Sequence, residues 1–334
     1  MSAAEAPGVS LIRTKVHGPV ARALVPRPTL VERLVDGPAR RLTLIRGQAG
    51  WGKSSLLAAW SAADSRRFAW LALDNGDNDP VRFFLYAIEA LQTLQASIGE
   101  RSASIVRTPG IDMIDQVLPV LINELDALPE SVFVLKDAHV INNADVYEAV
   151  SYLLDHAPPN LELVLSTRVE PPLPISRLRG RGELLEIAAS DLQFSVEDAH
   201  TLLVDHQGLV LERSDVQRLV ERTEGWPAGL YLAALSLRGR EDVGEFIDAF
   251  AGDDRNVVDY LTTEVLAGQA ADTRAFMLST SVLDRLCAPL CDEVIEGNGS
   301  AATLKDRRID LLPDRARYPA GVVPLSSPVP RSVA

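Results

Sequence analysis

An eight-residue motif, G-Q-A-G-W-G-K-S at Gly47–Ser54, constrains this chain more than any other feature of its sequence. The short apolar run Leu42–Ile45 precedes the motif, and an apolar helical pattern beginning at Ser55 follows it. A G-x-x-x-x-G-K-S spacing in a strand-to-helix turn is the pattern of a phosphate-binding loop, and this context disfavours a glycine-rich turn with an incidental lysine. Glycines let backbone N–H groups curl around phosphates, the lysine reaches the β- and γ-phosphates, and the serine hydroxyl holds Mg²⁺. The sequence therefore predicts a bound nucleoside triphosphate.

Short apolar runs alternate with longer helical patterns from Leu42 to Ile187, which predicts an α/β domain with a parallel sheet and crossover helices. The expected strands are Leu42–Ile45, Phe68–Leu73, Val132–Leu135, Leu161–Leu165 and Leu184–Ile187, and the expected helices are Lys53–Ala63, Pro80–Leu94 and Ile114–Leu128. After Ile187 the pattern changes. An S-x-x-D start signal at Ser195 and Asp198 opens a small helical domain, and a further helical segment is expected at Asn256–Glu296.

Composition excludes several classes of protein. With 334 residues, 47% of them hydrophobic, the chain is long enough for two domains and has ample core material. Lys+Arg of 33 against Asp+Glu of 46 gives a net charge of −13, which disfavours a face that grips nucleic acid through bulk charge. The start lacks a basic region followed by an apolar one, and no run approaches the ~18 apolar residues of a membrane span. We therefore expect a cytoplasmic protein without membrane contact.

The two cysteines, Cys287 and Cys291, stand four residues apart in a segment with a helical pattern. That spacing places both side chains on one helix face. None of the five histidines lies nearby in the sequence, so a metal site there lacks ligands. We expect two buried, reduced thiols.

Charged residues follow two of the expected strands. The run Val132–Leu135 leads into Lys136 and Asp137, so one carboxylate stands where a metal-holding strand end often has two. Neighbouring strand residues point to opposite sides, so Asp137 need not replace an acid at position 136. Lys136 either supplies charge beside the γ-phosphate or is a solvated strand-end lysine. Leu161–Leu165 leads to Arg168, which either touches a γ-phosphate at the carboxyl edge of the sheet or is a surface arginine.

These pieces occur together and in one order. In this order the chain resembles the N-terminal part of the large ATP-dependent LuxR-type (MalT-like) transcriptional regulators, within the STAND class of P-loop NTPases. The resemblance is close to continuous from Leu11 to about Gly297. The matching stretches are LIRTKVHGP (Leu11–Pro19), VPRPTLVERL (Val25–Leu34), LIRGQAGWGKSSLLAAW (Leu44–Trp60), AWLALDNGDNDPVRFF (Ala69–Phe84), VFVLKDAHVI (Val132–Ile141), LVLSTRVEPPLPISRLRGRGELLEI (Leu163–Ile187), TEGWPAGLYLAALSL (Thr223–Leu237) and TSVLDRLCAPLCD (Thr280–Asp292).

The resemblance implies a three-part nucleotide switch that holds ADP at rest, self-associates with ATP and uses hydrolysis as a reset. The implied organisation is an N-terminal extension (1–24), a P-loop nucleotide-binding α/β domain (25–194), a helical domain (195–245), a winged-helix-like clamp (246–304) and an unmatched tail (305–334).

The resemblance also implies three groups of nucleotide contacts. The phosphate loop supplies Gly47, Gln48, Ala49, Gly50, Trp51, Gly52, Lys53, Ser54 and Ser55. Adenosine is contacted by Val25, Pro26 and Arg27, and the G-x-P that packs on adenine is Gly225, Trp226 and Pro227. The implied catalytic pair is Asp137 with the sensor Arg168, and the implied Mg²⁺ ligands are Ser54 and Asp137.

Two departures limit what the resemblance carries over. Lys136 occupies the position of the first of the two acidic residues that usually end this strand in the family. The resemblance therefore implies at most slow ATP hydrolysis. The family continues into a helical-repeat inducer sensor and a helix-turn-helix that this sequence lacks, so we expect no direct DNA binding by this chain.

The last thirty residues are unlike the rest. From about Lys305, Arg, Pro, Asp and Ser accumulate without periodicity, which predicts a disordered tail. With permissible codons chosen for Pro313–Arg331, reading one base later yields LIALDTRRGWYRYHHLFR, which is similar to the sequence that closes the family's winged helix. The hypothesis is a frameshift between about Gly297 and Pro313 that leaves the third domain incomplete, and the nucleotide sequence tests it.

The leading hypothesis is thus an ATP/ADP-binding switch module of a LuxR-type regulator, without the sensor and DNA-binding parts. One alternative is a P-loop enzyme such as a small-molecule kinase, for which Asp74, Asp77 and Asp79 could be offered as acceptor-site acids. Asp79 is better explained as the N-cap of a helix that begins at Pro80. A second alternative is an inactive remnant that acts only through contacts. Nucleotide titration separates the three.

Overall fold

The computed structural model describes residues 11–20, 24–37, 40–240, 242–250, 254–266, 271–283 and 287–306. The chain divides into two compact units. The first comprises residues 1–47 and 53–191, and the second comprises residues 48–52 and 192–334. Five residues of the phosphate loop therefore pack with the second unit, although their neighbours on both sides in the chain belong to the first.

The first unit is built on a five-stranded parallel sheet with the strand order β2-β3-β4-β1-β5. All five predicted strands are confirmed, with bounds that differ by no more than two residues. They are β1 (Leu42–Arg46), β2 (Arg67–Ala72), β3 (Ser131–Lys136), β4 (Leu161–Thr167) and β5 (Leu184–Ile187). The order places β4 between β3 and β1, so the strand that leads to Arg168 lies beside the strand that leads to the phosphate loop.

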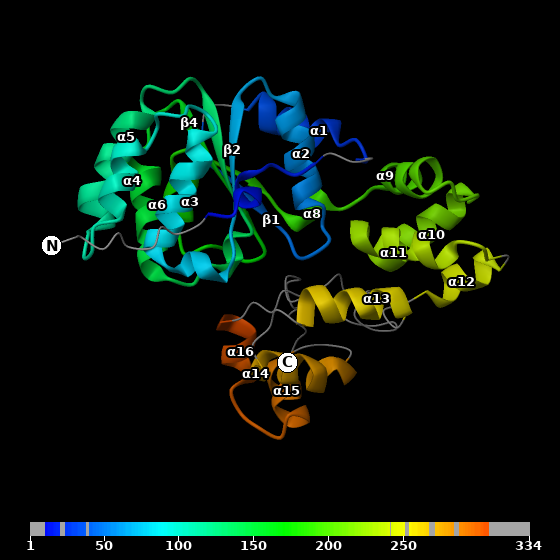
Figure 1. The fold of residues 1–334 in the computed structure, drawn as a ribbon. Helices are drawn as coiled ribbons and strands as arrows, with labels where there is room; N and C mark the ends of the chain where they lie inside the picture. Colours follow the sequence, from blue (N-terminus) through cyan, green and yellow to red (C-terminus); the bar gives the residue numbers. More distant parts are fainter. Residues whose placement is uncertain are drawn as a thin grey trace. The chain divides into compact units, whose positions relative to one another are not determined.

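Helices cover both faces of this sheet, which explains why most residues of the strands are apolar. In Figure 1, helices α3 to α6 lie on one side of the sheet, and α1 and α2 lie on the other. A hydrophobic cluster packs alternate residues of the strands against α3 and α6. The strand residues in it include Phe133, Leu135, Leu163 and Leu165. The helices are α1 (Pro28–Val35), α2 (Lys53–Ala63), α3 (Pro80–Gln92), α4 (Glu100–Val106), α5 (Leu118–Leu125), α6 (Ala144–His156), α7 (Ile175–Gly180) and α8 (Ala189–Leu192), with short turns η1 (Arg13–Val16), η2 (Asn75–Asn78), η3 (Met113–Val117) and η4 (Ala138–Val140).

The described part of the second unit is helical. Its elements are α9 (Val196–His200), η5 (Thr201–His206), α10 (Arg213–Thr223), α11 (Pro227–Leu237), α12 (Val243–Ala249), α13 (Arg255–Tyr260), η6 (Leu261–Leu266), α14 (Ala271–Ser279), η7 (Thr280–Val282), α15 (Ala288–Val294) and α16 (Ser300–Asp306). The predicted start signal is confirmed, because Ser195 and Asp198 form a reciprocal capping box at α9.

The prediction of two buried thiols is wrong for one of them. Cys291 is fully buried beside Phe276, but Cys287 is exposed, and both thiols are free. The reason is local, since Cys287 adopts an extended N-cap conformation just outside α15 and does not share the helix face.

The predicted tail at 305–334 lies almost wholly outside the described residues, so the frameshift and the incomplete third domain stay predictions. The finer domain bounds within the second unit also stay predictions. Within the described ranges, no helix combines the length and the apolar character that crossing a membrane requires.

Candidate nucleotide site

The phosphate loop leaves β1 at Arg46 and enters α2 at Lys53. Gly47 is tied to the sheet, because its N–H donates to the carbonyl of Thr167 at 3.2 Å. Gly50 and Gly52 have φ angles of +76° and +80°, which a residue with a Cβ adopts only with strain. At Gly52 a Cβ meets nothing within 4 Å, so the backbone conformation alone requires glycine there.

The tip of the loop is bonded to the start of α11, which belongs to the same unit. The indole N–H of Trp226 donates to the carbonyl of Ala49 at 3.1 Å, and the N–H of Ala228 donates to the carbonyl of Gly50 at 3.1 Å. A Cβ at Gly50 comes within 2.4 Å of the Cβ of Ala228 and 2.9 Å of the hydroxyl of Tyr260. Glycine at position 50 thus lets the loop approach the helix closely.

The predicted G-x-P forms the turn that makes this approach. Gly225 has a φ of +65°, and a Cβ there lies 2.5 Å from the carbonyl oxygen of Phe194. Trp226 is fully buried, and Pro227 occupies the first turn of α11. The indole packs on the phosphate loop and over Gly229, so its observed partner is the loop itself. A contact of this motif with adenine stays a prediction.

Lys53 begins α2 and is 8% exposed. Its ammonium group donates a hydrogen bond to the carbonyl of Gly47, at the other end of the loop. Ser54 and Ser55 follow in the first turn of α2, where unpaired N–H groups and the helix dipole favour an anion. The lysine, the two serines and the glycines therefore occupy the local positions that phosphate binding requires.

The end of β3 differs from a regular strand. Asp137 has a φ of +62° and a ψ of +36°, a left-handed conformation that is uncommon for a residue with a side chain. The alternation used to place Asp137 opposite Lys136 therefore does not apply beyond the strand end. The Nζ of Lys136 lies 3.7 Å from Oδ2 of Asp137, with both side chains about one-third exposed.

The donors for Mg²⁺ are few. Mg²⁺ in phosphate sites is usually held by one or two carboxylates together with substrate phosphates. The predicted ligands Ser54 and Asp137 supply one hydroxyl and one carboxylate, and the ammonium group of Lys136 already pairs with that carboxylate. Among the described residues, no group of three or more His, Cys, Asp or Glu forms a metal site. These donors do not fit a strongly held Mg²⁺.

Arg168 directly follows the end of β4, the strand between β3 and β1. The strand end is buried, with Ser166 and Thr167 at most 1% exposed. The hydroxyl of Ser166 has no hydrogen-bond partner. Pairing of Leu135 with Leu165 places Lys136 and Ser166 one residue farther along neighbouring strands. The carboxyl edge of the sheet thus gathers Lys136, Asp137, Ser166 and Arg168.

His139 also lies at this edge, and the sequence patterns did not single it out. It sits on η4, which contacts β4, and its ring is half-buried. Burial and the positive charges of Arg168 and Lys53 lower the pKa of His139 to about 4, although the negative charge of Asp137 opposes them. The imidazole is therefore neutral near pH 7. Only the D-x-H spacing after the strand could have identified it.

The predicted adenosine-contacting segment belongs to the first unit. Val25 and Pro26 lie outside helix and strand, and Arg27 is the N-cap residue of α1. The guanidinium of Arg27 donates to the carbonyl of Asp191 at 2.8 Å. These residues are thus held at the end of the first unit, and their contact with adenosine stays a prediction.

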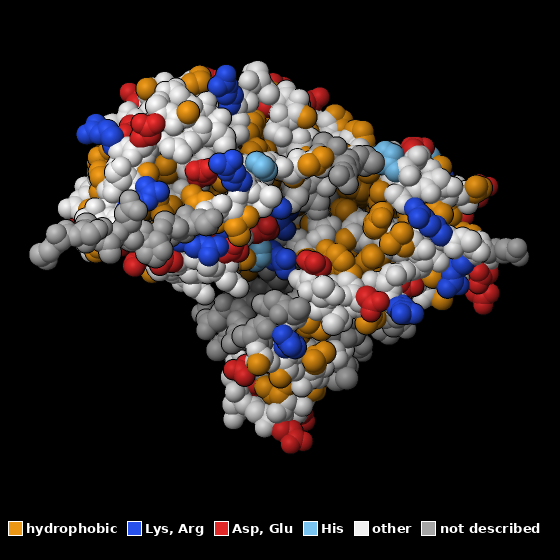
Figure 2. Space-filling view, viewed as in Figure 1, with side chains coloured by type: hydrophobic (Ala, Val, Ile, Leu, Met, Phe, Trp, Pro, Cys, Tyr) orange, Lys and Arg blue, Asp and Glu red, His pale blue; other side chains and the backbone are white. Residues whose placement is uncertain are grey.

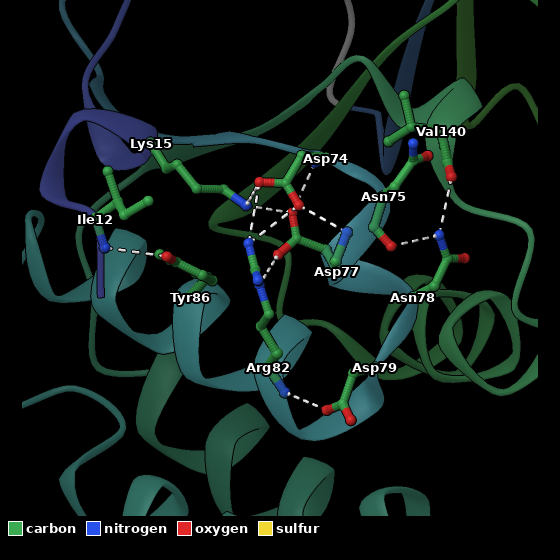
Figure 3. A network of polar contacts seen from close by, with 11 residues as sticks. Ile12, Lys15, Asp74, Asn75, Asp77, Asn78, Asp79, Arg82, Tyr86 and Val140 are labelled. Atoms are coloured by element: carbon green, nitrogen blue, oxygen red, sulfur yellow. Dashed lines mark hydrogen bonds and ion pairs between the residues drawn. The ribbon is translucent and has the colours of Figure 1, made fainter. Parts of the chain in front are cut away.

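The acidic loop after β2 has a structural explanation. Asp77 is fully buried and pairs with Lys15 and with Arg82, whose Nε lies 3.1 Å from Oδ1 of Asp77. Asp74 pairs with the same two cations at 2.9 and 3.0 Å. Figure 3 shows the two carboxylates between Lys15 and Arg82. Asp79 accepts from the N–H of Arg82 at 2.8 Å, so its predicted role as N-cap is confirmed. Ion pairing and capping account for all three acids.

Acidic and basic side chains are intermixed over the face shown in Figure 2. That arrangement accords with a net charge of −13 and with the many local ion pairs of arginine.

Comparisons with known proteins agree with this architecture. Residues 262–308 match the sequence model of the MalT winged helix domain family. Over 277 residues the chain is 35% identical to the HTH-type transcriptional regulator MalT of Yersinia enterocolitica, covering 82% of this chain and 31% of that protein. This chain belongs to the MalT-like family. The predicted resemblance is thereby confirmed, as is the predicted α/β P-loop fold with a winged-helix region.

The same segment occurs in a second kind of MalT-like relative. Over 288 residues the chain is 34% identical to the serine/threonine-protein kinase PknK of Mycobacterium tuberculosis, covering 85% of this chain and 26% of that protein. This MalT-like chain thus spans about a quarter to a third of the length of the curated relatives it matches. Among solved structures, a Walker-type ATPase of Pyrococcus abyssi aligns with a TM-score of 0.57 at 16% identity, covering 87% of this chain and 91% of that one. At that identity the likeness shows the fold alone.

Proposed function

We propose that this chain is an adenine-nucleotide-binding regulatory module, in which the phosphate loop reports the bound nucleotide to the helical unit. The observation that carries the proposal is the double hydrogen bond from Trp226 and Ala228 to the loop carbonyls of Ala49 and Gly50. A loop that curls around phosphates must place its N–H groups toward them, which fixes the direction of its carbonyls. A change at the phosphates therefore acts on the bonds that hold α11.

The relatives support a regulatory role. The shared segment is found in a transcriptional regulator and in a protein kinase, two proteins whose names describe different outputs. A segment common to both is best explained as the part that controls an output and not as the output itself. For this chain we propose ATP and ADP as ligands, slow hydrolysis because Lys136 pairs with Asp137, and self-association in the ATP state.

Isothermal titration with ATP and ADP tests the proposal. We expect binding of both nucleotides by the wild-type protein and loss of both in Lys53→Ala, because the loop then lacks its ammonium group. The matched control is Arg66→Ala, since Arg66 is a partly buried cation of the same unit that pairs with Asp64 and Glu162. A folded wild-type protein that binds neither nucleotide contradicts the proposal, as does full affinity in Lys53→Ala.

The alternatives give different results in the same experiment. A small-molecule kinase consumes ATP only when an acceptor is added, and its product carries the phosphate. An interaction remnant binds no nucleotide at all. The engagement of Asp74, Asp77 and Asp79 in ion pairs and capping favours the regulatory module over the kinase.

A further inference from the structure

Residues 11–18, which we call the strap, cross the edge of the sheet at β2. Strand β2 is the last strand on one side of the sheet, and η1 within the strap contacts both β2 and α3. Val16 is buried in the hydrophobic cluster that includes α3. Gly18 lies against the indole of Trp70, because a Cβ there comes within 2.7 Å of Nε1, and Trp70 stacks on Phe68, which packs against α2. The strap therefore touches both faces of the edge strand.

Lys15 attaches the strap to the loop after β2. Its ammonium group pairs with the carboxylate of Asp77 and lies 2.9 Å from Oδ2 of Asp74. The side chain of Lys15 is 9% exposed, and that of Asp77 is fully buried. The ammonium group also lies 4.2 Å from the ring centroid of Tyr86, whose hydroxyl accepts from the N–H of Ile12 at 3.0 Å (Figure 3). These contacts fix the strap on the loop and on α3.

The two carboxylates keep a cation when the strap leaves. Arg82 of α3 pairs with both of them, at 3.1 Å from Asp77 and 3.0 Å from Asp74, and the reciprocal capping bonds of the two acids also stay. The apolar attachment is small, because Val16 alone is a buried apolar residue of the strap, all of which the structure describes, and Ile12 is 57% exposed. Opening of the strap therefore needs less free energy than unfolding of the sheet.

The loop that Lys15 holds also supports the turn after β3. The side-chain amide of Asn78, the last residue of η2, donates to the carbonyl of Val140 at 3.0 Å. Its Oδ1 accepts from the N–H groups of Asn142 and Asn143 at 2.7 and 3.0 Å. Because β2 and β3 are parallel, their following loops lie at the carboxyl edge of the sheet, from which the phosphate loop also leaves β1. Docking of the strap and the geometry of this edge thus depend on the same four-residue turn, η2.

We propose that the strap is a detachable regulatory element of the nucleotide site, and that Lys15 is the positioning residue through which its docking prepares that site. This inference rests on the proposed function, because it requires a nucleotide at the phosphate loop. A site that is already held in its binding arrangement loses less conformational entropy when the ligand binds. By linkage, a nucleotide that prefers the docked form stabilises docking by the same factor.

Hydrogen exchange followed by mass spectrometry tests this linkage in the wild-type protein. The N–H groups of Ile12, Lys15 and His17 are hydrogen-bonded in the docked strap. We expect saturating ATP or ADP to slow their exchange at least about fivefold, the lower end of typical couplings between sites, and to have no effect in Lys53→Ala. The N–H of Arg66, which is hydrogen-bonded at the opposite end of β2, is the internal reference and should exchange at an unchanged rate.

Calorimetric titration of Lys15→Met tests the role of the cation. Methionine keeps the length of the side chain and removes its charge, so we expect the strap to exchange faster and the Kd for both nucleotides to rise about tenfold. The matched control is Arg66→Met, since Arg66 also pairs with two carboxylates, Asp64 and Glu162, but at the amino end of the same strand. We expect this control to lose stability and to keep the wild-type Kd values.

A double-mutant cycle tests whether Lys15 acts through η2. Without the side chain of Asn78 the loop no longer holds the turn after β3, so Lys15→Met should weaken nucleotide binding no further in the background of Asn78→Ala. Additive losses in the double variant mean that the two residues act independently, and they overturn the positioning role of Lys15.

The remaining outcomes separate this inference from the proposed function. If the wild type binds nucleotide without slowing exchange in the strap, the strap is a structural cover only, while the nucleotide module stands. This result needs no variant and decides the matter even where Lys15→Met does not fold. Equal losses of affinity in Lys15→Met and Arg66→Met overturn the inference in the same way. If the folded wild type binds neither nucleotide, the proposed function itself fails and the linkage fails with it.

Discussion

The indole N–H of Trp226 donates a hydrogen bond to the carbonyl of Ala49 at 3.1 Å, which joins a fully buried ring of the helical unit to the phosphate loop. The two residues are 177 positions apart in the sequence. A phosphate loop is commonly regarded as an extension of its sheet, but here its tip packs with the second unit. This relationship is the structural basis of the proposal that the phosphate loop reports a bound nucleotide to the helical unit.

Trp226→Phe isolates that bond. Phenylalanine keeps an aromatic ring and leaves the buried carbonyl of Ala49 without its donor, so we expect a loss of about 1–3 kcal/mol in the free energy of unfolding. Because the bond positions the loop, nucleotide affinity should fall as well. Urea denaturation and nucleotide titration measure the two effects.

Trp60→Phe is the matched control, since the fully buried Trp60 donates to Asp64 at 2.8 Å from within α2. It loses a comparable bond and should lose stability, while nucleotide affinity stays at the wild-type value. Equal loss of affinity in both variants shows that the bond to Ala49 has no special role.

Gly50→Ala and Gly52→Ala separate backbone strain from steric overlap. Both positions have positive φ, so each alanine costs about 1–2 kcal/mol in stability. At Gly52 the added methyl group meets nothing, but at Gly50 it lies 2.4 Å from the Cβ of Ala228. We therefore expect Gly50→Ala to be the less stable variant by about 1–3 kcal/mol, measured by urea denaturation without nucleotide. Equal stabilities contradict the close packing of loop and helix.

The sequence predicted the sheet well because each of its signals is local. Apolar runs such as Val132–Leu135 are buried on both faces, and the G-x-x-x-x-G-K-S spacing fixes a strand before the loop and a helix after it. The helix that begins at Pro80 could also be predicted, because Asp79 and Pro80 form a start signal that depends on neighbouring residues alone.

The features that the sequence did not predict depend on contacts between distant residues or on an irregular backbone. Nδ1 of His139 is buried without a partner, and the side chain of Asn78 donates to the carbonyl of the next residue, Val140. Both features follow from the meeting of two loops, which no local pattern encodes. The pairing of Lys136 with Asp137 required the left-handed backbone at Asp137, whereas strand alternation argued for side chains on opposite sides. The exposure of Cys287 likewise reflects an N-cap conformation inside a segment with a helical pattern.

Lys136→Asp tests what limits turnover. The change removes the ammonium group that pairs with Asp137 and adds a second carboxylate at the strand end. We expect Mg²⁺-dependent ATP hydrolysis to rise at least tenfold, about 1.4 kcal/mol of barrier, in a phosphate-release assay. Lys136→Met removes the cation alone and should give a smaller increase. Unchanged rates in both variants show that a feature other than the missing acid limits hydrolysis.

The ion pairs that Asp74 and Asp77 form with Lys15 and Arg82 predict that the stability of the protein depends on pH. Burial raises the pKa of Asp74, but hydrogen bonds from Lys15 and from the N–H of Gly76, together with the charges of Lys15 and Arg82, outweigh it and hold this pKa below 3.8. Folding therefore favours the ionised carboxylate. Its stabilisation is fully present above the unfolded pKa of 3.8 and is lost as the pH falls through the lower folded value.

We accordingly expect the free energy of unfolding to decrease as the pH falls below about 4, and to decrease less in Asp74→Asn, which has no ionised form to lose. The pKa values of Asp64 and Asp191 are also lowered, because hydrogen bonds and charges from Arg66 and Arg33 outweigh burial, so part of the decrease remains. Urea denaturation between neutral pH and about pH 3 measures both curves. Parallel curves for the wild type and Asp74→Asn mean that the carboxylate of Asp74 contributes no stability through its charge, and that Lys15 and Arg82 are held by Asp77 alone.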